Sequence, residues 1–125
     1  MKLSKLTDLR FTPALNKLIQ QPLPLNTALK LKNVSLQISE ELKRYEEARV
    51  AALYKFGKKK EDGSLTADDA GNVIFEAEDN AKSFADEITK LLSSEVEVPS
   101  FNASEFGSDA KISSEEVSLL EFISL

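Results

Sequence analysis

The chain contains no cysteine and no histidine. Without cysteine there is no disulfide, no thiol nucleophile and no structural zinc site of the usual kind. Without histidine, the chain lacks the side chain that most often acts as a general acid or base near neutral pH. From these absences we expect that the protein is not an enzyme and that it has no catalytic, metal or cofactor site.

Positive charge is also scarce, because 16 Lys and Arg face 21 Asp and Glu and leave a net charge of −5. Phosphate backbones and anionic membranes attract basic surfaces, so we expect neither nucleic acid nor a membrane as a partner. The run Lys58–Lys60 is followed directly by Glu61 and Asp62. It is typical of a solvated helix end, where lysines offset the negative end of the helix dipole. No apolar run approaches the roughly 20 residues that span a bilayer, and no signal peptide is visible.

The chain has four glycines and four prolines, and none of them lies between residue 25 and residue 56. Pro22 and Pro24 precede this interval and Gly57 follows it, which is the usual punctuation of one helix. Such a helix would be roughly 48 Å long. Its apolar residues recur at steps of three and four and form one stripe, which favours packing within the domain or, since the spacing is near seven, pairing with another chain. The stripe comprises Leu31, Val34, Ile38, Leu42, Tyr45, Ala48, Ala52 and Phe56.

Shorter elements flank the long helix. Thr12-Pro13 predicts a helix over 13–20, and Asp79 is a candidate N-cap for a helix over 80–92. Short strands are predicted over 64–66, 73–75 and 95–98, around Asp-Gly and Gly-Asn turns. We therefore predict a single domain, 1–125, of the α+β class and mostly helical, with one long central helix, two to three shorter helices and a small antiparallel sheet.

The carboxyl-terminal segment has the clearest local signature. Ser113 and Glu116 have the spacing of a capping box, so a helix is predicted over 114–123. This helix is apolar almost all round, and we expect it to be covered by the long helix or by another subunit. The candidate interface residues are accordingly Leu31, Ile38, Leu42, Tyr45, Leu119, Leu120, Phe122 and Ile123.

Several segments together resemble a family of small uncharacterised proteins of tailed bacteriophages and prophages. The resemblance covers the chain from about residue 25 onward, while residues 12–24 and the longer loop over 64–71 depart from it. It implies a phage origin, a small accessory role, and no catalytic residue that could be transferred. The matching segments are Tyr45-Glu46-Glu47-Ala48-Arg49, Tyr54, Glu61-Asp62-Gly63, Phe84, Glu95-Val96-Glu97-Val98, Ile112-Ser113 and Leu120-Glu121-Phe122-Ile123.

The excess of apolar helical surface and this resemblance favour a phage structural or assembly protein that acts by protein–protein contacts. Such a virion component, adaptor or assembly factor would bind other protein subunits, either phage structural proteins or itself, in the host cytoplasm or the virion. The alternative is a soluble phage-encoded regulator that binds a host or phage protein. Particle proteomics and the oligomeric mass would separate the two.

Overall fold

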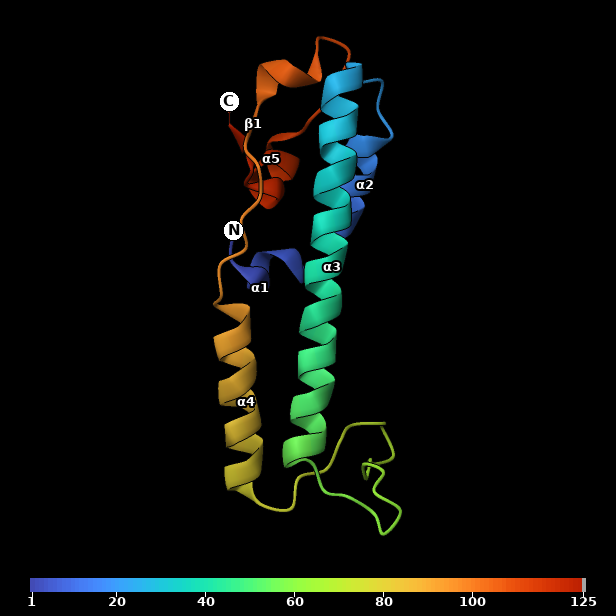
Figure 1. Ribbon diagram of the computed structural model, residues 1–125, viewed down its shortest axis with the longest axis vertical. Coiled ribbons are helices and arrows are strands. Elements are labelled where there is room, and N and C mark those ends of the chain that lie inside the picture. The colour runs from blue at the N-terminus through green and yellow to red at the C-terminus, as the bar shows by residue number, and fades with distance from the viewer. Residues whose placement is uncertain (125) are drawn as a thin grey trace. The chain divides into compact units, whose positions relative to one another are not determined.

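A computed structural model describes residues 1–124, and the chain divides into two compact units (Figure 1). The first unit comprises residues 1–42 and the chain from residue 94 onward, and the second comprises residues 43–93. The long helix α3 contributes its first part to the first unit and its remaining part to the second. The elements in order are α1 (Leu3–Leu6), α2 (Phe11–Ile19), α3 (Leu25–Phe56), α4 (Glu78–Leu92), β1 (Phe101–Asn102), the 3₁₀ helix η1 (Ala103–Phe106), α5 (Ser114–Leu120) and β2 (Ile123–Ser124).

The prediction of one long helix over 25–56 is confirmed to the residue. At its end, the amide of Gly57 still donates to the carbonyl of Leu53 at 2.7 Å. A Cβ on Gly57 would lie 2.6 Å from that carbonyl oxygen and under 3 Å from the side chains of Leu65 and Val73. Glycine therefore permits the close return of the following loop against the helix end.

The predicted antiparallel sheet is wrong, because the only named sheet within residues 1–124 pairs β1 with β2 in parallel. Phe101 is registered with Ile123, and the amide of Phe101 donates to the carbonyl of Phe122 at 2.7 Å. The chain between the two strands passes through η1 and α5, and a helical crossover returns it in the same direction. The three segments predicted as strands carry isolated antiparallel bridges, such as those of Leu65 with Lys59 and Val73 with Ala67.

The core of the first unit is closed. α5 packs against α2, whereas the sequence led us to expect that the long helix or another subunit would cover it. The ring of Phe101 lies 5.5 Å from those of Phe106 and Phe122, centroid to centroid. The buried apolar side chains of this unit are Leu3, Leu6, Phe11, Ala14, Leu15, Leu18, Leu31, Val34, Ile38, Val96, Phe101, Phe106, Leu120, Phe122 and Ile123.

An ion pair joins α2 to the start of α5. Ser113 caps α5, because its hydroxyl accepts a hydrogen bond from the amide of Glu116 at 3.1 Å, as the capping-box spacing predicts. The Glu116 carboxylate accepts a hydrogen bond from Lys17 Nζ at 2.9 Å. Hydrogen bonding to the Lys17 ammonium lowers the pKa of Glu116, against the opposing effect of its burial.

The second unit consists of the end of α3, an ordered loop and α4. The loop folds back on itself through backbone hydrogen bonds, with Thr66 donating to Lys58 at 2.8 Å and Ile74 donating to Thr66 at 2.9 Å. Its two turns have Gly63 and Gly71 at positive φ, where a side chain would be strained. In contrast with the first unit, the second buries a single residue fully, Ala52, and α4 buries none.

Candidate interaction surface

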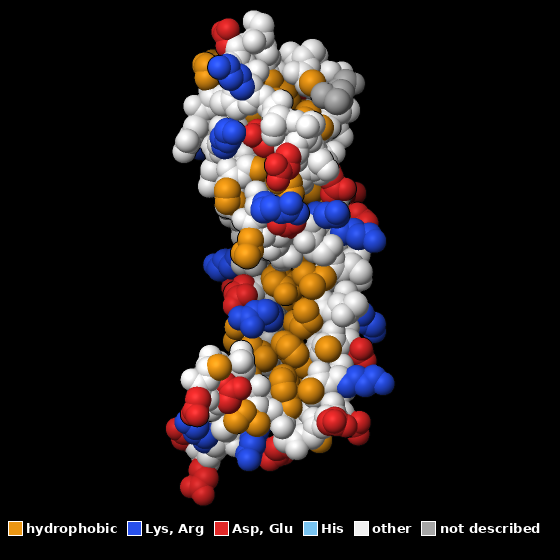
Figure 2. All heavy atoms as spheres, turned by 180° about the vertical axis from the view of Figure 1, so that it is seen from behind, with side chains coloured by type: hydrophobic (Ala, Val, Ile, Leu, Met, Phe, Trp, Pro, Cys, Tyr) orange, Lys and Arg blue, Asp and Glu red, His pale blue; other side chains and the backbone are white. Residues whose placement is uncertain are grey.

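A half-buried apolar surface runs between the two helical parts of the second unit, which are antiparallel (Figure 1). Its side chains recur at three- and four-residue steps, so they share one face on each helix. Figure 2 shows apolar atoms gathered along the part of the view that this unit occupies. We call this surface the apolar seam; it comprises Tyr45, Ala48, Ala52 and Phe56 of α3, and Ala81, Phe84, Ile88, Leu91 and Leu92 of α4.

Few specific contacts hold the two sides of the seam together. Lys55 of α3 forms an ion pair with Glu87 of α4 at 3.0 Å, between side chains that are both more than a third exposed. Exposed pairs of this kind contribute at most about 1 kcal/mol. At the loop end, the rings of Phe75 and Phe84 lie 5.5 Å apart. A shallow hollow beside them is lined by Leu53, Val73 and other residues of this unit.

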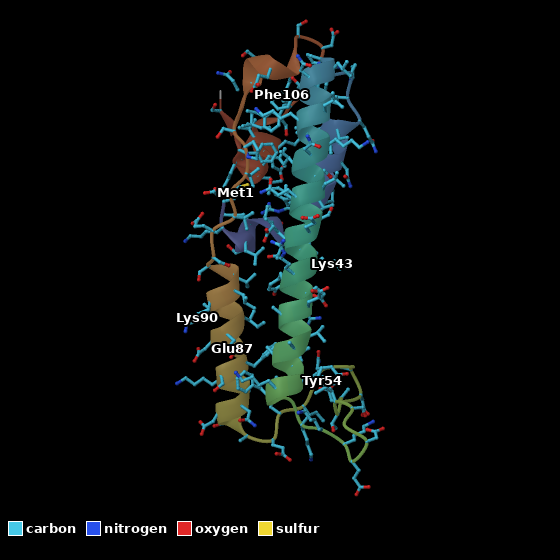
Figure 3. The ribbon with its side chains drawn as sticks, in the orientation of Figure 1. Met1, Lys43, Tyr54, Glu87, Lys90 and Phe106 are labelled. Carbon is cyan, nitrogen blue, oxygen red and sulfur yellow. The ribbon has the colours of Figure 1, made fainter. Side chains whose placement is uncertain are left out.

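Charged side chains border the seam on α3. Arg49 donates to Glu46 at 2.9 Å, one turn earlier on the same helix. This hydrogen bond lowers the pKa of Glu46. On the other helix, Lys90 points away from α3, and Tyr54 lies on the side of α3 that faces away from α4 (Figure 3). The polar exterior of the two helices is therefore distinct from the seam.

The structure separates the predicted interface residues into two groups. Five of them are buried in the core of the first unit: Leu31, Ile38, Leu120, Phe122 and Ile123. Leu42 and Leu119 of the same unit are half-buried. Tyr45 is half-buried in the second unit, where it belongs to the seam. The predicted set is thus not one continuous surface of either unit.

A second apolar surface lies on the first unit and was not assigned to the interface from the sequence. Leu25, Leu29 and Leu36 of α3 are exposed by 74%, 54% and 59%. Their spacing of four and seven residues places them on one face of the helix, away from the buried Leu31 and Val34. The signal was present in the sequence as leucines that fall outside the main stripe.

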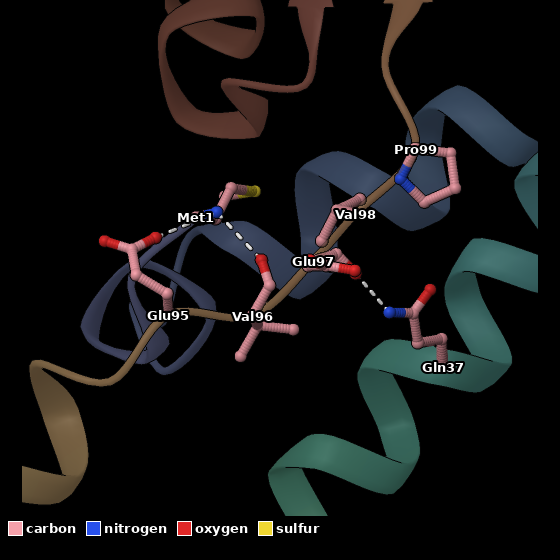
Figure 4. A pocket seen from close by; sticks show the side chains of 7 residues that line it. All are labelled: Met1, Gln37, Glu95, Val96, Glu97, Val98 and Pro99. Carbon is pink, nitrogen blue, oxygen red and sulfur yellow. Dashed lines mark hydrogen bonds and ion pairs between the residues drawn. The ribbon is translucent and has the colours of Figure 1, made fainter.

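A hollow of the first unit is lined by Met1, Gln37 and residues 95–99 (Figure 4). The Met1 amine donates to the carbonyl of Val96 at 2.9 Å and lies 3.5 Å from the Glu95 carboxylate. Gln37 donates to the carbonyl of Glu97. These polar groups bind one another, and their hydrogen bonds hold the extended segment against α1 and the first part of α3.

The turn carboxylates of the second unit also have structural partners. Asp68 accepts hydrogen bonds from the amides of Ala70 at 3.0 Å and Asn72 at 2.9 Å, which fixes the turn around Gly71. Asp62 accepts from the amide and hydroxyl of Ser64, and these bonds lower its pKa. Within residues 1–124, no group of three or more His, Cys, Asp or Glu side chains is placed to hold a metal ion.

Over the same described residues, no helix combines the length and the apolar character that crossing a membrane requires. Comparison with protein-family models, with curated proteins and with solved structures finds no match.

Proposed function

We propose that the protein acts by protein–protein contact, as a structural or assembly component of a tailed bacteriophage. The observation that carries the proposal is the apolar seam, whose large side chains stay half-buried, whereas the core side chains of the first unit are fully buried. Apolar surface exposed in one continuous patch is typical of a protein-binding site. The phage assignment is supported by the resemblance of the segments from residue 45 to residue 123.

The difference between the cores of the two units also supports this role. The first unit has a closed core with three clustered phenylalanines, and such a core provides a stable base. The second unit offers short, half-buried side chains, Ala48 and Ala81, between larger ones. Small residues on a helix face allow a further helix to approach closely, so the seam is suited to a helical partner.

The test is proteomics of the particles made by the phage or prophage that encodes the chain. A component or assembly factor is expected in purified particles, or in assembly intermediates isolated before maturation, at a fixed ratio to other structural proteins. Recovery of the chain solely with a host protein, with none in particles or intermediates, would refute a structural role and favour the regulator.

A further inference from the structure

We infer that the apolar seam binds a second copy of this chain, so that the two hairpins of the second units form a four-helix bundle. This inference rests on the proposed function, because it names the partner of the same surface. Two features of the second unit favour this occupant: its incomplete core, which no disulfide stabilises, and the signs of charge on its two helices.

The first feature is the incomplete core. Phe56, Phe84 and Ile88 each remain half-buried, so covering them would add a fraction of the roughly 1.5–3 kcal/mol by which full burial of such a side chain stabilises relative to exposure. A two-helix hairpin has too few faces to enclose its own apolar stripes, whereas four helices enclose theirs in a common core. Since the chain has no cysteine, a disulfide cannot stabilise this small unit, and association is a common alternative in units of this size.

The second feature is the charge on the two helices. The α3 part of the second unit has four basic and two acidic residues, while α4 has four acidic and two basic residues. Packing α3 of one copy beside α4 of the other brings a helical part with two more basic than acidic residues next to a helix with two more acidic than basic residues. Packing α3 on α3 would place like signs together, which is unfavourable. The basic residues of α3 are Lys43, Arg44, Arg49 and Lys55, and the acidic ones are Glu46 and Glu47; α4 has Glu78, Asp79, Asp86 and Glu87 against Lys82 and Lys90.

This pattern favours a second copy over an unrelated partner. A strongly acidic partner would be repelled by α4 and a strongly basic one by α3. A copy of the same hairpin presents both signs in the complementary order, as a two-fold symmetric interface requires. Alternating signs around the bundle also repeat the pairing that Lys55 and Glu87 already make within one chain.

The experiment measures the mass of the full chain in solution by sedimentation equilibrium. We expect about twice the 13.8 kDa of one chain at micromolar concentration. Two matched variants place arginine on α4, each at a small exposed position. Ala85→Arg adds its side chain at the edge of the seam and should reduce the mass to that of one chain, whereas Ser83→Arg, on the opposite face, should leave the dimer intact. Circular dichroism should show both variants as helical as the parent.

The salt dependence tests the arrangement of the helices. If α3 lies beside α4 of the other copy, raising NaCl from about 0.05 to 0.5 M should weaken the dimer by about threefold or more. A dimer that salt strengthens would overturn the proposed arrangement. A monomeric parent, or a dimer that survives Ala85→Arg, would overturn the seam as the self-association surface. If the chain is found in purified particles but is monomeric, the inference of a dimer is wrong and the proposed function is supported. If the chain is a dimer but is absent from particles and intermediates, the inference is supported and the proposed function is wrong.

Discussion

Truncating Leu120 to alanine should destabilise the first unit far more than the same change one residue earlier. Leu120 is fully buried at the end of α5, whereas Leu119 is half-buried. The change removes three carbon atoms, worth about 0.8 kcal/mol each in transfer free energy, and leaves a cavity that adds to the cost. We expect a loss of about 3 kcal/mol for Leu120→Ala and about 1 kcal/mol for Leu119→Ala.

Urea unfolding followed by far-ultraviolet circular dichroism measures this difference. With a slope near 2 kcal/mol per molar urea, a loss of about 3 kcal/mol lowers the midpoint by roughly 1.5 M. The two tyrosines, Tyr45 and Tyr54, both lie in the second unit, so their fluorescence reports that unit separately. Equal midpoints for the two alanine variants would refute the assignment of Leu120 to the core.

Three further changes test the loop and the ion pair. Gly57→Ala should destabilise the second unit by about 1–3 kcal/mol, because the added Cβ would clash with the carbonyl oxygen of Leu53; thermal melting by tyrosine fluorescence measures this loss, and an unchanged melting temperature would contradict the clash. Glu116→Gln should lower the free energy of unfolding at pH 7, because it removes the ion pair with Lys17. This difference from the parent should shrink as the pH falls below about 4.5, since protonation of Glu116 then ends the same pairing in the parent. A difference that does not change with pH would contradict the lowered pKa of Glu116. Asp68→Ala should speed amide exchange over 68–72 and leave α4 unchanged, and unaltered exchange there would show that the carboxylate does not hold the turn.

Elements with local causes could be predicted from the sequence. The bounds of α3 follow from the prolines before it and the glycine after it, and the start of α5 follows from Ser113, whose hydroxyl caps it. The end of α5 could not be read this way. The helix stops at Leu120 rather than at Ile123, because Glu121 adopts a left-handed conformation with φ of 42°. That reversal lets Ile123 and Ser124 pair with β1, and this requirement comes from the tertiary fold.

The predicted orientation of the strands in the sheet was wrong for a related reason. Alternating residues over 95–98 and the Asp-Gly turn indicate extended backbone and tight reversals, which are typical of antiparallel pairing. The actual partners, β1 and β2, are two residues each and are separated by η1 and α5. No periodicity exists over two residues, so the path of the intervening chain alone decides their direction.

The candidate surface shows why a stripe does not by itself indicate an interface. Leu31 and Ile38 belong to the same predicted stripe as Tyr45 and Phe56, yet the first two are buried and the last two are half-buried. The difference lies in the neighbours: the first unit brings several short elements and three clustered phenylalanines to its part of α3, while the second brings α4 and a loop. The spacing of apolar residues predicts which face of a helix is apolar, but it does not predict how many other elements will cover that face.

The unequal burial of the two units also determines how the chain should respond to association. The first unit already has a buried core of its own, so its stability does not depend on a partner that covers the seam. The second unit keeps part of its seam in contact with water, and any partner that covers the seam stabilises it by mass action. Its stability should therefore rise with protein concentration while that of the first unit stays constant. Tyrosine fluorescence melts over a hundredfold range of concentration would show this difference, and concentration-independent melting of the second unit would mean that the seam is closed by its own chain.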